Sequence, residues 1–131
     1  MALFAAVFRT LVNLLNAQFG HIDTSPNAPH EKALREGERP EIDVPVSSGK
    51  MNFAAEERRT EIVLRLALSE EAITAGSLIQ AQEWARKAKT EIPRIFPKFE
   101  KRIRIAITEM KSSGDMEILE IFIIDPKSSH T

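Results

Sequence analysis

The chain has 131 residues, 43% of them apolar and 28% charged, so it is long enough for one globular domain with extensions and is not disordered as a whole. It contains no cysteine, which excludes disulfides, thiolate nucleophiles and cysteine zinc sites, and which favours a reducing intracellular compartment. The formal net charge of −1 excludes an overall field that would direct the chain to nucleic acid or to a membrane.

The first segment, residues 2–18, is predicted to be an amphipathic helix that stops at Gly20. Its apolar side chains recur every three or four residues, and Arg9 lies on the opposite side. A charge at mid-length disfavours a membrane span, and the basic start and cleavage site of a secretory signal are poor. These apolar side chains form a stripe along the helix, and three covers for it remain: the protein's own core, a partner or a membrane surface. We expect a partner, and the residues predicted to dock on it are Phe4, Val7, Phe8, Leu11, Val12 and Leu15.

Residues 20–50 are predicted to be an extended arm that tethers the first helix at a distance. They contain four prolines, three glycines and many charges, which is typical of a linker. Within them, only residues 41–46 alternate between apolar and polar side chains. Because Pro45 lacks an amide donor, this stretch is predicted to be an edge strand at most.

Two further helices are predicted to form a hairpin. The first covers residues 52–75, which are apolar on more than one side. After a glycine, the second covers residues 77–92, beginning at Ser77 with a glutamine three residues later and ending before Pro93. Trp84 lies beside an alanine-rich seam on this helix and is predicted to be a core or rim residue, in preference to a contact for a partner.

The C-terminal part is predicted to be a β-hairpin, because MEILEIFIID is rich in β-branched and aromatic residues and a Ser-Ser-Gly loop precedes it. The predicted register pairs Glu109 with Glu117, Ile107 with Leu119, Ile105 with Ile121, and Ile103 with Ile123. One face is then an aliphatic ladder that packs on the helices. The other face is half apolar, and its expected cover is either residues 41–46 or another molecule.

These elements predict an α+β fold in four parts. Residues 1–19 are the docking helix, residues 20–50 the arm, residues 51–126 a small α+β domain, and residues 127–131 a polar tail.

The sequence gives no pattern typical of an enzyme. The histidines, His21, His30 and His130, all lie in the predicted arm or tail, where no packed element holds a metal ligand. Ser112 and Ser113 have no base near them in the sequence. We therefore expect no catalytic residue, metal, cofactor or small-molecule substrate.

Charge is unevenly distributed along the chain. Residues 86–111 contain nine Lys/Arg and three Asp/Glu, whereas residues 51–85 contain three and six. We expect the two segments to meet and to neutralise each other in part. An alternative is a nucleic-acid-binding surface made of Arg94, Lys98, Lys101, Arg102 and Arg104.

The function favoured by these patterns is that of a non-enzymatic structural or accessory subunit. Its apolar N-terminal helix and arm are predicted to dock into a larger assembly or a homo-oligomer, because a detached apolar helix is unstable alone. The first alternative is the small nucleic-acid-binding protein described above. The second alternative is a membrane-surface protein that binds through the same helix.

Overall fold

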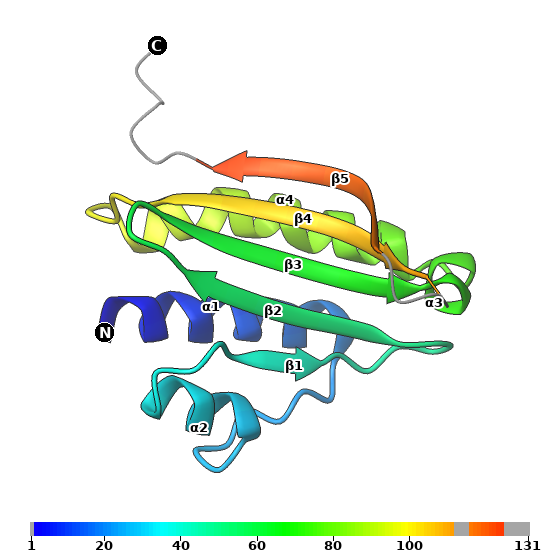
Figure 1. Cartoon of the computed structure of the whole chain (residues 1–131), viewed down its shortest axis with the longest axis horizontal. Coiled ribbons are helices and arrows are strands. Elements are labelled where there is room, and N and C mark those ends of the chain that lie inside the picture. The colour runs from blue at the N-terminus through cyan, green and yellow to red at the C-terminus, as the bar shows by residue number, and fades with distance from the viewer. Residues whose placement is uncertain (1, 112–115, 125–131) are drawn as a thin grey trace.

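The computed structural model describes residues 2–111 and 116–124, without the side chains of residues 120–124. In this part of the chain a five-stranded sheet is covered on one face by two long helices, α1 (Ala2–Phe19) and α4 (Ser77–Ile95) (Figure 1). A short helix, α2 (Pro29–Arg35), lies beside the β1 edge, and another, α3 (Glu70–Thr74), follows β3. The predicted α+β class is confirmed.

The strands of the sheet are ordered as in the sequence, β1–β2–β3–β4–β5. Their bounds are β1 Glu41–Asp43, β2 Met51–Glu57, β3 Glu61–Ser69, β4 Arg102–Met110 and β5 Met116–Ile124. All neighbours are antiparallel except β3 and β4, which are parallel and are joined by the crossover through α4. This topology puts β1 and β5 at the two edges of the sheet.

The first helix forms where the apolar spacing predicts it. Gly20, with a φ of +81°, ends it, and the Gly20 amide donates to the carbonyl of Asn16 at 2.7 Å. The Asn16 side chain accepts from the amide of Ile22 at 3.0 Å and so fixes the direction in which the chain leaves the helix.

The predicted helix over residues 52–75 is wrong, because this stretch forms β2, β3 and the one-turn helix α3. Met51, Phe53 and Ala55 of β2 are buried while their neighbours are more exposed, which is the two-residue period of a strand. In β3 the even-numbered residues from Ile62 to Leu68 are buried in the same way. The helical interpretation failed because the connection between the strands, residues 58–60, contains none of the usual turn residues.

The fourth helix confirms the predicted helix over 77–92 and extends it to Ile95. Its N-cap is Gly76, with a φ of +96°, so the capping pattern predicted at Ser77 is wrong. Ser77 is instead buried in the first turn. Pro93 lies inside the last turn, where few helical bonds remain to be lost.

The C-terminal strands form the predicted antiparallel hairpin, with a corrected register. Glu109 pairs with Glu117 as expected, but a bulge after Ile107 shifts the remaining pairs by one residue. The pairs are Ile107 with Glu120, Ile105 with Phe122, and Ile103 with Ile124. The predicted Ser-Ser-Gly loop and the tail at 127–131 lie outside the described residues.

The predicted arm packs along the edge of the sheet near β1 instead of holding the first helix at a distance. Arg9 of α1 forms a two-pronged pair with Glu31 of α2, with Nε to Oε2 at 2.9 Å and Nη2 to Oε1 at 2.7 Å. Residues 41–43 pair with β2 as an edge strand, which confirms that prediction over a shorter range. The predicted boundary between helix, arm and domain therefore does not divide the core.

Aromatic contacts tie the layers together. The ring of Phe8 on α1 stacks on Phe53 of β2 at 5.5 Å, and Phe53 meets Trp84 of α4 edge-on at 5.3 Å. The Trp84 indole Nε1 donates to the carbonyl of Leu11 at 3.2 Å. Trp84 is fully buried, so of the two predicted positions, core or rim, it has the core position, and it joins α1, β2 and α4.

Candidate interaction surface

The six apolar residues predicted to dock on a partner lie in the protein's own core. Phe4 is 8% exposed and the other five are at most 2% exposed: Val7, Phe8, Leu11, Val12 and Leu15. The prediction that they face a partner is therefore corrected. The sequence indicated rightly that the stripe needs cover, and the inward row of the sheet together with α4 supplies it.

The basic residues proposed for nucleic acid do not form a single free patch. Lys101 contacts Glu57 at 2.6 Å, and Arg104 contacts Glu61 at 3.0 Å. Arg94 pairs with Glu91 on its own helix. The remaining two, Lys98 in the connection after α4 and Arg102 at the start of β4, are exposed.

These ion pairs confirm that the basic segment meets the acidic segment before it. They join β2 and β3 to β4 and the turn before β4, across sequence separations of 44 and 43 residues. Such pairs leave fewer free cations for a row of phosphate contacts.

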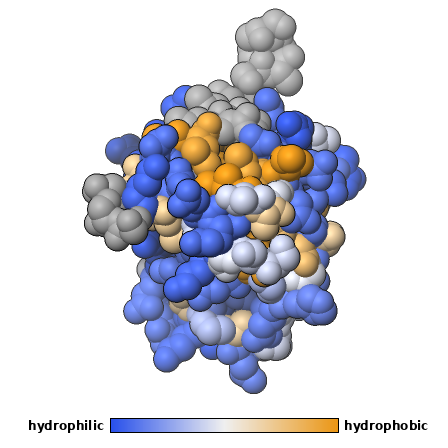
Figure 2. Space-filling model, turned by 90° about the vertical axis from the view of Figure 1, so that its right-hand side faces the viewer, coloured by the Kyte–Doolittle hydropathy of each residue, from blue (hydrophilic) through white to orange (hydrophobic). Residues whose placement is uncertain are grey.

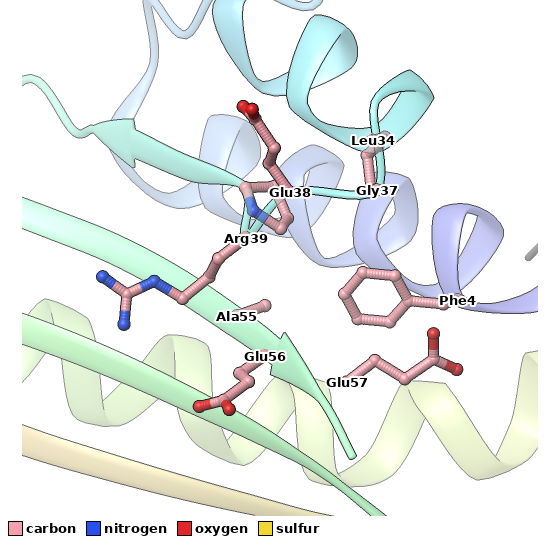
Figure 3. Close-up of a pocket in the computed structure, with 9 residues that line it drawn as sticks. Phe4, Leu34, Gly37, Glu38, Arg39, Ala55, Glu56 and Glu57 are labelled. Atoms are coloured by element: carbon pink, nitrogen blue, oxygen red, sulfur yellow. The ribbon is translucent and has the colours of Figure 1, made fainter. Parts of the chain in front are cut away.

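A pocket of about 220 Å³ lies between α1, the turn after α2, and β2 (Figure 3). Its floor is Phe4, and its rim carries Arg39, Glu56 and Glu57. Figure 3 shows the carboxylates of Glu56 and Glu57 pointing in different directions and the Arg39 side chain pointing away from Phe4. Because acid–base chemistry needs groups that converge on one atom, this rim has no catalytic geometry.

A buried histidine lies beside this region. His30 of α2 packs on Phe8 at 5.7 Å, and burial lowers its pKa from the ordinary value of 6.5. Hydrogen bonds from Arg9 lower the pKa of the neighbouring Glu31 carboxyl. No group of three or more His, Asp or Glu residues in the described part of the chain is placed to hold a metal ion. His30 thus belongs to the packing of α2 on α1.

The two faces of the sheet differ in their cover. One face carries the buried rows under α1 and α4, whereas no helix covers the opposite face in Figure 1. On this open face the β1–β3 side is charged, with Glu41, Asp43, Glu56, Glu61 and Arg65. Water can solvate these charged side chains, so that half of the face needs no further cover.

On the β4–β5 side of the open face, Arg102 and Arg104 lie at the start of β4, and the part nearer its end is uncharged. The register places Ala106, Thr108 and Met110 of β4 beside Met116 and Ile118 of β5, and we call these five residues the neutral surface. Met116 is 50% exposed and Ile118 is 60% exposed. The Thr108 hydroxyl lies 3.3 Å from the sulfur of Met116, which holds the methionine over the buried threonine.

Figure 2 views the end of the molecule at which α3 lies. Apolar side chains gather in its upper part, at the level of β5 and α4 in Figure 1, and the lower part is mainly hydrophilic. The charges beside the neutral surface compensate each other, since Lys111 contacts Glu109 at 3.1 Å and Glu117 at 3.2 Å. These contacts raise the pKa of Lys111.

The two edges of the sheet are unlike. β1 has three residues, two of them acidic, and prolines at 40 and 45 flank it, so it is a poor template for another strand. β5 has nine residues, without proline or lysine, and no described strand pairs with its outer side. Its protective features are one bulge and two acids, Glu117 and Glu120.

Part of this surface was indicated by the sequence. The second face of the predicted hairpin is half apolar, and it was expected to be covered by residues 41–46 or by another molecule. Residues 41–43 lie at the opposite edge of the sheet, next to β2, so they do not provide that cover. The exposure of Met116 and Ile118 was not predicted, because it depends on a sheet topology that the sequence interpretation did not contain; the bulge lies beyond them and leaves their pairs unchanged.

Comparison with known proteins gives no match: no protein-family model, no curated protein and no solved structure resembles the chain significantly. Among the helices that the structure describes, none has the length and apolar character needed to cross a membrane.

Proposed function

We propose that the protein is a non-enzymatic structural or accessory subunit that joins its assembly through the neutral surface and the free edge of β5. The observation that carries this proposal is a nine-residue edge strand, β5, in which Met116 and Ile118 are exposed. Free backbone groups and apolar side chains along one edge are what a protein partner binds by strand addition.

This proposal keeps the class of function expected from the sequence and moves the contact site. The stripe on α1 has become core, so the assembly contact needs another apolar surface. Among the surfaces with large exposed apolar side chains, the one at β5 also offers a row of backbone hydrogen-bonding groups.

The two alternatives have weaker support. A nucleic-acid surface would rely on Lys98 and Arg102, since Arg94, Lys101 and Arg104 are already paired with carboxylates. A membrane-surface role would need the apolar stripe of α1 to leave the core, which exposes most of the side chains that hold α1 to β2 and α4.

The test is site-specific photo-crosslinking in the organism that makes the protein. A photoreactive residue at position 118 is expected to give discrete covalent adducts with protein. The matched control is position 3, because Leu3 is also half-exposed, at 46%, but lies at the start of α1. Equal adducts from both positions, or none from position 118, would overturn the proposal.

A further inference from the structure

We infer that the outer side of β1 holds a binding site for a guanidinium group, in a pocket that β1 forms with the segment between α1 and α2 and with the first turn of α2. The pocket has a volume of about 330 Å³ and is lined by residues 21–23, 28–30 and 41–43. The site is independent of the neutral surface, because β1 and β5 are opposite edges of the sheet (Figure 1).

The first argument is a buried polar side chain at the pocket without a hydrogen-bonding partner. His30 is only 4% exposed, yet it lines the pocket. Neither of its ring nitrogens makes a hydrogen bond within the described part of the chain, since Oε2 of Glu31 lies 3.8 Å from Nε2, beyond hydrogen-bonding distance. Burial lowers the pKa of His30, so at neutral pH the ring is uncharged and one nitrogen is a free acceptor. A donor on a ligand would satisfy this acceptor.

The second argument is negative charge without a compensating cation. Asp23 and Asp43 line the pocket, and neither forms an ion pair with a residue that the structure describes. The third acid of the lining, Glu41, contacts Arg39 only at 4.0 Å. Hydrogen bonds from Ser25 lower the pKa of Asp23, so its carboxyl group is charged at neutral pH. The pocket therefore favours a cation over a neutral or anionic ligand.

The third argument is the free backbone of β1 at this edge. The amide of Val44 donates to the carbonyl of Met51 at 2.8 Å, and hydrogen-bonded positions alternate along an antiparallel pair of strands. Glu41 and Asp43 therefore direct their backbone N–H and C=O groups away from β2, to the side on which α2 lies (Figure 1). Their carbonyl oxygens add acceptors to the carboxylate of Asp23 and the ring nitrogen of His30.

The spacing of these acceptors selects the kind of cation. In the described ranges, no three His, Asp or Glu side chains converge closely enough to hold a metal ion. A guanidinium is planar and carries five N–H donors in a rigid fork, so it reaches acceptors that lie apart. An ammonium group is a compact and strongly hydrated point charge, which needs convergent acceptors. Ile22, Pro29 and Ile42 provide apolar wall for the carbon stem of such a cation.

The test is an NMR titration of the full-length, isotope-labelled chain with two guanidinium probes. One probe is the blocked tripeptide acetyl-Gly-Arg-Gly-amide, and the other is N-ethylguanidinium. We expect saturable shifts of the backbone amides of residues 21–23, 30 and 41–43, with a dissociation constant between about 0.1 and 10 mM. A tripeptide that binds about 10-fold more tightly than ethylguanidinium identifies an arginine of a protein as the natural ligand, and equal or weaker binding identifies a free small molecule.

Two further tripeptides are the matched controls for the ligand. Citrulline in place of arginine keeps the shape of the side chain without its charge and should bind at least about 10-fold more weakly. Lysine keeps the charge without the planar fork and should bind about threefold more weakly or less well still.

Variants of the chain test the lining. Asp23→Asn keeps an oxygen that accepts from the Ser25 amide, a bond of 3.0 Å, but removes the charge, so the dissociation constant should rise about 10-fold. His30→Phe keeps a ring beside Phe8 and removes both nitrogens, and should raise the constant about threefold or more. The control is Glu36→Gln, the same loss of charge at an exposed position just after α2 and outside the pocket, which should leave the constant unchanged. The spectrum of each variant shows whether it is folded.

Several outcomes would overturn the inference. These are the absence of saturable shifts at the pocket amides, equal binding of the arginine tripeptide and either control peptide, and unchanged binding in a folded His30→Phe variant. Equal weakening by Asp23→Asn and Glu36→Gln would overturn it too, because it would indicate attraction by net charge alone. The peptide comparison uses the unmodified chain, so it decides even if a variant does not fold. None of these results bears on photo-crosslinking from position 118, so the proposed function and this inference fail separately.

Discussion

Replacing Phe8 tests whether α1 is part of the core or a docking helix. The side chain of Phe8 is fully buried and its ring contacts Phe4, His30 and Phe53. Truncation of a buried phenylalanine to alanine costs about 3–5 kcal/mol, because apolar contact is lost and a cavity remains. We therefore expect Phe8→Ala to remove a large part of the roughly 5–15 kcal/mol that stabilises a domain of this size.

Urea unfolding followed by tryptophan fluorescence measures this cost. Trp84, the single tryptophan of the chain, is buried against α1 and reports when that helix leaves. With an m value of about 2 kcal/mol per molar urea, a loss of 4 kcal/mol lowers the midpoint by about 2 M. Phe8→Leu, which keeps most of the volume, should cost less than about 1.5 kcal/mol and serves if the alanine variant does not fold.

The control is Leu3→Ala on the same helix, where the side chain is 46% exposed and the cost should be less than about 1 kcal/mol. If Phe8→Ala and Leu3→Ala destabilise the protein equally little, α1 does not belong to the core in solution. The docking interpretation of the stripe would then be correct after all.

Three further predictions concern other parts of the molecule. Gly49→Ala should destabilise the fold by about 2 kcal/mol, because φ is +77° and a Cβ would lie 2.3 Å from the Ser69 hydroxyl that caps α3. The control is Gly37→Ala, where φ is +71° but the space is open, and it should cost only about 1 kcal/mol in the same urea assay. Equal costs for the two variants would contradict the steric argument. The folded-state pKa of His30 lies below its ordinary value of 6.5, so its contribution to stability is complete above pH 6.5 and is lost as pH falls through the folded pKa. Thermal unfolding between about pH 5 and 8 should show stability falling toward acid pH, and His30→Gln should reduce this dependence. Fluorescence anisotropy should detect no binding of RNA or DNA oligonucleotides even at about 20 mM salt, and binding that weakens as salt rises would instead favour the basic segment as the functional surface.

Local patterns predicted much of the secondary structure, because the residues that set helical spacing or form a turn are near neighbours in the sequence. The first helix, α4, the C-terminal hairpin and the β1 edge strand were all indicated in this way. The alternation of buried residues from Ile62 to Leu68 was present as well, but without a glycine or proline turn at 58–60 it resembled a helix covered on two sides. One bulge also shifted the hairpin register by a residue, which a pattern of side chains does not reveal.

The candidate site was less accessible to prediction than the fold. The stripe on α1 is covered by β2, β3 and α4, which lie far from it in the sequence. The identity of its cover therefore depends on the tertiary structure. Once β2 and β3 had been interpreted as a helix, the only sheet predicted was a small hairpin packed on the helices, and a partner became the expected cover of the stripe. The free surface at β5 followed from the order of the strands, which sequence periodicity does not determine.

The bond between Trp84 and Leu11 has a consequence for synthesis, since it spans 73 residues. At about 5–20 residues per second, the ribosome needs about 4–15 s to make that length of chain. Throughout this interval the newly made first helix lacks α4, and it lacks β2 and β3 as well until these strands have been made. The core that joins α1, β2 and α4 therefore closes only after residues beyond Trp84 have been made.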